Sequence, residues 1–153
     1  MMKSKNDKLI LLKDKIINVS MKKGKKHTGE KILLKFSKLL QKSTKKNLQS
    51  LVQLALINST PAFKLNEQSM KKGKRKSKKA IPSFIVKDSL RIMTALKFIT
   101  SIAYRNKRSI SFYKSLVKEV LASSHLKSQS IEQKNKLQTQ VLLNKRYLSK
   151  FRW

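Results

Sequence analysis

The chain has 153 residues, in which 38 lysines and arginines outnumber seven acids to give a formal net charge of +31. This length suits a single domain with one core. A charge this large opposes compaction by self-repulsion, which indicates a polyanionic partner. The sequence contains no cysteine, so disulfides, thiolate catalysis and cysteine-based metal sites are excluded.

The acids are scattered singly, and the three glycines do not form a phosphate-binding loop. The sequence therefore offers neither paired carboxylates for acid–base catalysis nor a nucleotide site. We expect no enzymatic activity, no cofactor and no metal. No stretch of about 18 apolar residues occurs, so no helix is expected to cross a membrane.

Apolar residues recur at three- and four-residue spacing through most of the chain, which is typical of amphipathic helices. We predict six helices, at about residues 7–23, 29–42, 45–59, 89–105, 110–123 and 131–148. The connections between neighbouring helices are short, which favours a compact bundle of antiparallel neighbours. The fold class is therefore mainly α, in one domain over residues 1–153.

Each predicted helix has capping signals and one apolar face. Gly24 is expected just after the first helix, and Thr60 with Pro61 is expected to end the third. The expected N-caps are Asn6 or Asp7, Thr28 (with Glu30 in the first turn), Ser43 or Thr44, Asp88 or Ser89, and Ser130 with Gln133 as a capping box. The expected core residues are Leu9, Leu12, Ile16 and Val19; Ile32, Phe36, Leu39 and Leu40; Leu48, Leu51, Val52 and Ala55; Ile92, Ala95, Leu96, Ile99, Ile102 and Ala103; Phe112, Leu116, Val117, Val120 and Leu121; and Leu137, Val141, Leu142 and Leu148.

Between the third and fourth predicted helices, residues 68–79 read QSMKKGKRKSKK and contain no acid. Residues 62–66 alternate apolar and polar, and residues 81–86 are rich in β-branched and aromatic side chains, so both flanks are predicted strands. We predict a protruding β-hairpin, the ribbon, over residues 62–86 with a basic tip at 70–79. Pro82 donates no backbone hydrogen bond, which restricts the ribbon to an edge position. A disordered basic linker between two helical halves is the alternative.

Four sets of residues follow the order and spacing of a known family. They are Leu12 with Ile16-Ile17; Gly24-Lys25-Lys26 with Ile32-Leu33; residues 81–85 (IPSFI) leading into Ser89-Leu90-Arg91; and the terminal residues 151–153 (FRW). Together they cover nearly the whole chain. The sequence thus resembles the small-subunit ribosomal protein seven family in its organellar form.

This resemblance implies a six-helix domain with a protruding ribbon, which agrees with the fold predicted from spacing. It also implies a structural constituent of the small ribosomal subunit that binds the 3′ major domain of the ribosomal RNA (rRNA) and nucleates assembly of the head. The implied partners are small-subunit rRNA, neighbouring ribosomal proteins, and transfer RNA and messenger RNA near the exit site, which the ribbon would approach. A membrane and a second copy of the chain are not among them.

Lysine outnumbers arginine, and lysine is a flexible point charge suited to phosphate, so we expect the protein to read RNA shape more than bases. Tyr104, Tyr147, Phe151 and Trp153 are candidates for stacking on RNA, whereas the spacing of Phe36, Phe63, Phe98 and Phe112 indicates core positions. The predicted RNA-binding residues are Lys22, Lys23, Lys25, Lys26 and His27; Lys71, Lys72, Lys74, Arg75, Lys76, Lys78 and Lys79; Arg91, Lys97, Arg105, Lys107 and Arg108; and Arg152 with Trp153.

A histone-like protein that compacts nucleic acid is the alternative function, although the charge here is spread over a helical core without an evident dimerisation surface. A membrane-active cationic protein is a weaker alternative, because a core of this size would consume the narrow apolar stripes. Lysine, isoleucine, asparagine and serine are abundant while glycine and proline are scarce, a bias typical of an A+T-rich genome. We therefore expect a mitochondrial protein, with a plastid or the bacterial cytoplasm as alternatives.

Overall fold

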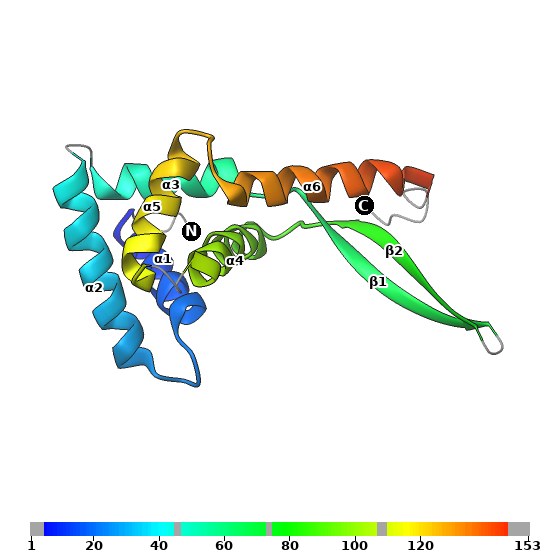
Figure 1. The fold of residues 1–153 in the computed structure, drawn as a ribbon, viewed down its shortest axis with the longest axis horizontal. Helices are drawn as coiled ribbons and strands as arrows, with labels where there is room; N and C mark the ends of the chain where they lie inside the picture. Colours follow the sequence, from blue (N-terminus) through cyan, green and yellow to red (C-terminus); the bar gives the residue numbers. More distant parts are fainter. Residues whose placement is uncertain (1–4, 45–46, 73–74, 107–109, 147–153) are drawn as a thin grey trace.

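The computed structural model describes residues 5–44, 47–72, 75–106 and 110–146, with residues 5–11, 68–72 and 75–79 described by their backbone alone. Six helices and two strands follow one another along these ranges (Figure 1). Their bounds are α1 (Lys5–Ser20), α2 (Lys26–Ser43), α3 (Leu48–Ser59), β1 (Phe63–Lys72), β2 (Arg75–Phe84), α4 (Asp88–Arg105), α5 (Phe112–Ser124) and α6 (Gln129–Leu143). The predicted fold class, six helices with a hairpin between the third and the fourth, is confirmed.

The ribbon is a two-stranded antiparallel sheet whose register runs from the pair Phe63↔Phe84 to the pair Lys72↔Arg75. It extends away from the helices, so that its far end stands clear of them (Figure 1). Pro82 lies in β2 opposite Leu65, and a two-stranded ribbon tolerates the missing amide because neither strand is central. The paired strands show that the alternative of a disordered linker was wrong.

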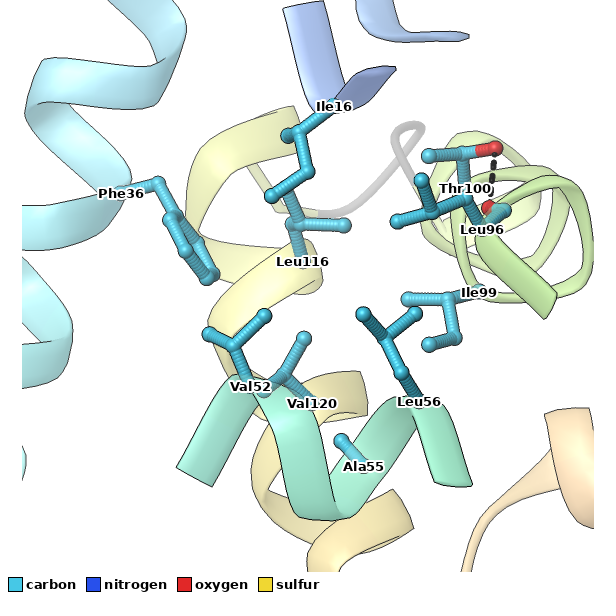
Figure 2. A pocket seen from close by; sticks show the side chains of 10 residues that line it. All are labelled: Ile16, Phe36, Val52, Ala55, Leu56, Leu96, Ile99, Thr100, Leu116 and Val120. Carbon is cyan, nitrogen blue, oxygen red and sulfur yellow. Dashed lines mark hydrogen bonds between the residues drawn. The ribbon is translucent and has the colours of Figure 1, made fainter. Parts of the chain in front are cut away.

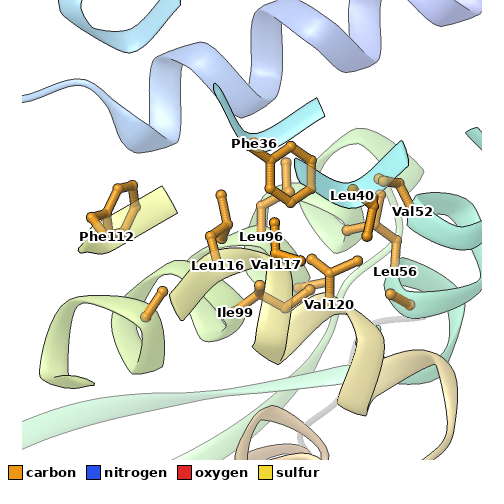
Figure 3. Packing of buried hydrophobic residues seen from close by; sticks show 13 residues of the cluster. Phe36, Leu40, Val52, Leu56, Leu96, Ile99, Phe112, Leu116, Val117 and Val120 are labelled. Carbon is orange, nitrogen blue, oxygen red and sulfur yellow. The ribbon is translucent and has the colours of Figure 1, made fainter. Parts of the chain in front are cut away.

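The core lies among α2, α3, α4 and α5, which together contribute thirteen buried apolar residues (Figure 3). Phe36 and Leu40 of α2 face Leu116 and Val120 of α5 within this cluster. The first helix covers it with partly buried side chains, including that of Ile16. The helical spacing therefore identified the inner face of each of these four helices, because burial of that stripe is what holds an amphipathic helix in place.

A cavity of about 20 Å³ lies inside this core, bordered by ten residues that include Ile16, Phe36 and Leu96 (Figure 2). The one hydroxyl on its border, that of Thr100, donates to the Leu96 carbonyl at 2.8 Å. A water would need two or more polar partners there. This cavity is a packing imperfection and not a ligand site.

The prediction for the ends of the first helix was wrong. The helix begins at Lys5, so Asn6 and Asp7 lie inside it and do not cap it. It ends at Ser20, three residues before the predicted end, because the chain turns sharply towards α2. Lys23 and Gly24 take the positive φ angles of 52° and 71° that this turn needs. Gly24 therefore serves the turn and does not follow the last helical residue.

Two more predicted N-caps were wrong because the hydroxyls have other uses. The second helix begins at Lys26 without a side-chain cap, which places Thr28 and Glu30 within its first turns. Ser43 and Thr44 end this helix, and their hydroxyls donate to the Leu40 carbonyl at 3.0 and 2.9 Å. The cap of α3 is instead Asn47, whose side chain accepts from the amide of Gln49 at 3.3 Å.

The fourth and sixth helices also begin differently from the prediction. Lys87 occupies the N-cap position of α4, so Asp88 is its first helical residue and places an acid at the positive end of the helix dipole. Ser128, not Ser130, caps α6 and accepts from the amide of Ile131 at 3.3 Å. Leu142, an expected core residue, is 65% exposed. The side chains of the expected core residues Leu9 and Leu148 lie outside the described residues.

A buried polar cluster, which was not predicted from the sequence, joins α3, α5 and α6. Its members are Ser59, Glu119, Ser123, Ser128 and Ser130, each at most 7% exposed. The Ser130 hydroxyl lies 2.9 Å from that of Ser123 and 2.7 Å from that of Ser128, while Glu119 accepts from the Ser130 amide at 3.1 Å. Because every hydroxyl in the cluster has a partner, its burial carries no desolvation cost from an unpaired group.

Candidate nucleic-acid interface

The connection from α1 to α2, together with the first two residues of α2, carries five of the predicted RNA-binding residues, and we call this stretch the basic turn. Its members are Lys22, Lys23, Lys25, Lys26 and His27, and all five are exposed. One acid lies nearby, since the Nδ1 atom of His27 is 3.7 Å from a carboxylate oxygen of Glu30. Four lysines in six positions leave the turn strongly positive, which suits closely spaced phosphates.

Tyr104 of α4 holds the basic turn against the core. Its hydroxyl donates to the Ser20 carbonyl at 2.7 Å, and its ring stacks on Phe112 with the ring centroids 4.2 Å apart. The Nζ atom of Lys22 lies 4.1 Å from the Tyr104 ring centroid, within the range of a cation–π contact. Burial raises the pKa of the phenol. The half-buried ring already contacts Phe112 and Lys22, so it does not stand free to stack on a base, the role for which it was a candidate.

The fourth helix contributes two exposed cations, Lys97 and Arg105. Arg105 directly follows Tyr104, so the structure brings the end of α4 beside the basic turn. The other predicted residues of this group, Lys107 and Arg108, lie outside the described residues. The same holds for the terminal pair Arg152 and Trp153 and for the candidate stacking residues Tyr147 and Phe151.

The outer face of α2 is a further basic surface, although its residues were not among the predicted RNA-binding set. Lys31, Lys35, Lys38 and Lys42 follow one another at intervals of four, three and four residues, and all are exposed. Lys35 Nζ lies 5.9 Å from the ring centroid of Tyr113. The spacing of these lysines, visible in the sequence, places them along one side of α2, and the basic turn leads directly into this helix.

At its far end the ribbon pairs like charges. Lys71 is the register partner of Lys76, and Lys72 is the partner of Arg75. Like charges directly opposite one another destabilise a two-stranded ribbon, so an anionic partner would favour the paired form. Lys78 and Lys79 are the register partners of Ser69 and Gln68, while Lys74 lies outside the described residues.

The near end of the ribbon is apolar and is fastened to α4 by Arg91. Phe63 and Phe84 meet edge to face with their ring centroids 5.7 Å apart. The Nε atom of Arg91 donates to the Ile85 carbonyl at 2.7 Å, and the guanidinium lies 4.8 Å from the Phe84 ring centroid. Asp88 is 3.8 Å from the same guanidinium. Arg91, predicted as an RNA-binding residue, is thus half-buried and positions the ribbon.

The basic turn and the far end of the ribbon lie at well separated places on the molecule (Figure 1). One chain therefore carries cations at two distant places, where they could meet phosphates that are far apart in a folded RNA. Within the described ranges, no group of side chains could hold a metal ion, and no helix is long and apolar enough to span a bilayer.

A comparison with protein-family models finds one described as Ribosomal protein S7p/S5e, which matches residues 2–145. No curated protein matches the sequence. The matched range includes the basic turn, the whole ribbon and all six helices.

Proposed function

Because this chain belongs to the ribosomal protein S7p/S5e family, we propose that it docks on the 3′ major domain of small-subunit rRNA and nucleates assembly of the subunit head. Members of the family are structural proteins of the small ribosomal subunit and not enzymes. They bind rRNA and neighbouring ribosomal proteins, and they serve translation. The match over residues 2–145 is the observation that carries the proposal.

The placement of charge supports docking by the helical body. The basic turn, the lysines of α2 and the end of α4 project from helices that share one core, so their positions relative to one another are rigid. Rigid cations select an RNA whose phosphates already have the matching arrangement, because neither partner then loses much conformational freedom on binding. This surface therefore recognises the shape of the folded RNA more than its base sequence.

The ribbon supports a second part of the proposal, namely that it approaches the transfer RNA and messenger RNA near the exit site. Its far end has a basic sequence and stands clear of the helices (Figure 1). Such an arm extends the reach of the protein to a second RNA. One copy of the chain would act in each subunit, without forming a homo-oligomer.

We also propose a mitochondrial ribosome as the site of action, on the basis of the amino-acid bias towards lysine, isoleucine, asparagine and serine. Cell fractionation tests this separately from the RNA-binding role. Recovery of the protein with plastid or cytoplasmic ribosomes would refute the mitochondrial assignment and leave the ribosomal one intact.

Sedimentation of the native protein tests the central proposal, since we expect it to migrate with the small ribosomal subunit. Binding to a fragment of the 3′ major domain and to duplex DNA, compared at equal salt, then separates the ribosomal role from histone-like compaction. We expect the rRNA fragment to bind more tightly, with an affinity that falls steeply with salt as counterions are released. Equal affinity for both nucleic acids, without migration with the subunit, would favour the histone-like alternative.

A further inference from the structure

Ser20, the last residue of α1, has a buried hydroxyl without a partner. The residue is 4% exposed, and its Oγ atom is the one buried side-chain nitrogen or oxygen without a hydrogen bond in the described part of the chain. Several other hydroxyls in the helices donate to a carbonyl three or four residues earlier, as those of Ser37 and Thr100 do. A buried polar atom without a partner costs free energy, and a bound ion or ligand is one way to satisfy it.

The residue borders a pocket of about 180 Å³ at the start of α2. Lys22, Lys25 and Thr28 also line this pocket, and Tyr104 forms part of its wall. The volume is far larger than a single water molecule needs. The pocket thus brings Ser20, whose hydroxyl lies just beneath the pocket surface, together with two cations of the basic turn.

The start of α2 adds free backbone donors. Its N-cap residue, Lys25, supplies no side-chain acceptor. The amide of Lys26 donates to the Gly24 carbonyl at 2.8 Å and that of Gly29 to the Lys25 carbonyl at 3.3 Å. Among the described residues, the amides of His27 and Thr28 have no such partner. Free amides at a helix start, with the positive end of the helix dipole behind them, favour an anion.

We propose that this pocket binds a single phosphodiester phosphate of the RNA. The phosphate oxygens accept hydrogen bonds from the Ser20 hydroxyl and from the first amides of α2, and Lys22 and Lys25 balance the charge. Binding here gives Ser20 the partner that it lacks in the free protein. The assignment rests on the proposed binding to rRNA and deepens it by naming the residues that hold one phosphate.

The variant Ser20→Ala tests the proposal, because it affects stability and binding in opposite directions. In the free protein the change removes an unsatisfied buried hydroxyl, so we expect the Tm to stay the same or rise. Affinity for an rRNA fragment at fixed salt should fall about tenfold, the effect of losing a hydrogen bond to a charged group. The matched control is Ser59→Ala, another buried serine, whose hydroxyl lies 3.4 Å from that of Ser130. In Ser59→Ala the Tm should fall, while the affinity for the rRNA fragment should stay unchanged.

Inorganic phosphate serves as a second probe. In a titration against chloride at equal ionic strength, the amide NMR signals of His27 and Thr28 should shift in the wild type and shift less in Ser20→Ala. Unchanged RNA affinity in Ser20→Ala overturns the assignment to RNA, even if the amides respond to free phosphate. A wild-type protein that binds no rRNA fragment would instead overturn the proposed function itself.

Discussion

The hydroxyl of Tyr104 donates a hydrogen bond of 2.7 Å to the backbone carbonyl of Ser20, a residue 84 positions earlier in the chain. This bond joins the last turn of α4 to the end of α1, directly before the basic turn. Because the Tyr104 ring also stacks on Phe112, one side chain connects α1, α4 and α5. The position of the basic turn is therefore determined by the core.

The variant Tyr104→Phe should lower the free energy of unfolding at pH 7 by about 1 kcal/mol, because it removes this hydrogen bond. Burial raises the Tyr104 pKa above its ordinary value of about 10, so the folded state holds the phenolic proton more tightly than the unfolded state. The resulting stabilisation is fully present below the unfolded-state pKa and is lost as the pH rises through the folded-state pKa.

Urea unfolding of both proteins from pH 7 to pH 11 would measure this difference. The stability advantage of the wild type should shrink above about pH 10, where the phenol begins to ionise in the unfolded chain. Titration of the many lysines affects both proteins and cancels in the comparison. A gap that stays constant across the whole range would show that burial does not protect the phenolic proton.

Gly29 lies where α2 packs closely against the end of α1. A Cβ atom added at this position would lie 3.3 Å from Ile17 Cγ2 and 3.5 Å from Met21 Cβ. Gly29→Val should therefore destabilise the protein by about 1 to 3 kcal/mol through overpacking. Thr28→Val is the matched control, since Thr28 is exposed and valine has nearly the same shape. Thermal unfolding that ranks the two variants equally would contradict the close approach.

Substitution of Leu96 tests which face of α4 packs against the core. It is 5% exposed and borders the small central cavity, so Leu96→Ala should cost about 2 to 5 kcal/mol (Figure 2). Leu90→Ala, on the same helix at 53% exposure, should cost much less. A net charge of +31 makes the free protein marginal, so both variants should also be unfolded in complex with RNA. Similar losses for the two leucines would mean that the assigned inner face of α4 is wrong.

The inner faces of the helices were predictable because helical spacing and burial have one physical cause. Phe36, Leu96 and Leu116 recur with the helical period since each must face the same core. The N-caps were predicted less accurately, because several neighbouring serines and threonines could each cap the same helix. Ser128 and Ser130 are two positions apart, and only the packing of α6 against α5 decides that Ser128 caps the helix while Ser130 turns inward.

The predicted interface was also incomplete, because it missed the roles of residues that contact segments distant in the sequence. The net charge and the lysine runs indicated the basic turn and the ribbon directly. Arg91 looked like one more surface cation, and its bond to the Ile85 carbonyl depends on how β2 leads into α4. Ser20 carried no signal at all, because its burial follows from the placement of neighbouring helices. Tertiary contacts such as those of Arg91 and Ser20 leave no periodic pattern in the sequence from which they could be predicted.

The ribbon register allows a test that separates the ribbon from the helical body. The pair Gln68↔Lys79 lies four positions from the terminal pair Lys72↔Arg75, so both have the same hydrogen-bonding phase. Replacing residues 69–78 by Asn-Gly should therefore close a shorter hairpin without shifting its register. The apolar contact between Phe63 and Phe84 and the bond from Arg91 to Ile85 remain in place.

We expect the shortened protein to keep its helical content, measured by circular dichroism, because the far part of the ribbon stands clear of the helices (Figure 1). Its affinity for the rRNA fragment should weaken but persist, with a shallower salt dependence, since six basic residues are lost between positions 69 and 78. Translation by reconstituted subunits should be impaired more than RNA binding, in a step that involves transfer RNA or messenger RNA at the exit side.

A second variant separates the effect of ribbon length, or reach, from that of charge. It keeps the full-length ribbon and changes the same six residues to serine. These are Lys71, Lys72, Lys74, Arg75, Lys76 and Lys78. If charge alone matters, both variants should lose the same amount of RNA affinity and translation. If reach also matters, the shortened protein should translate less well than the serine variant at equal RNA affinity. Loss of helical content, or complete loss of RNA binding in the shortened protein, would show that the ribbon and the body do not act separately, because the body alone should still present the basic turn and the lysines of α2 to the RNA.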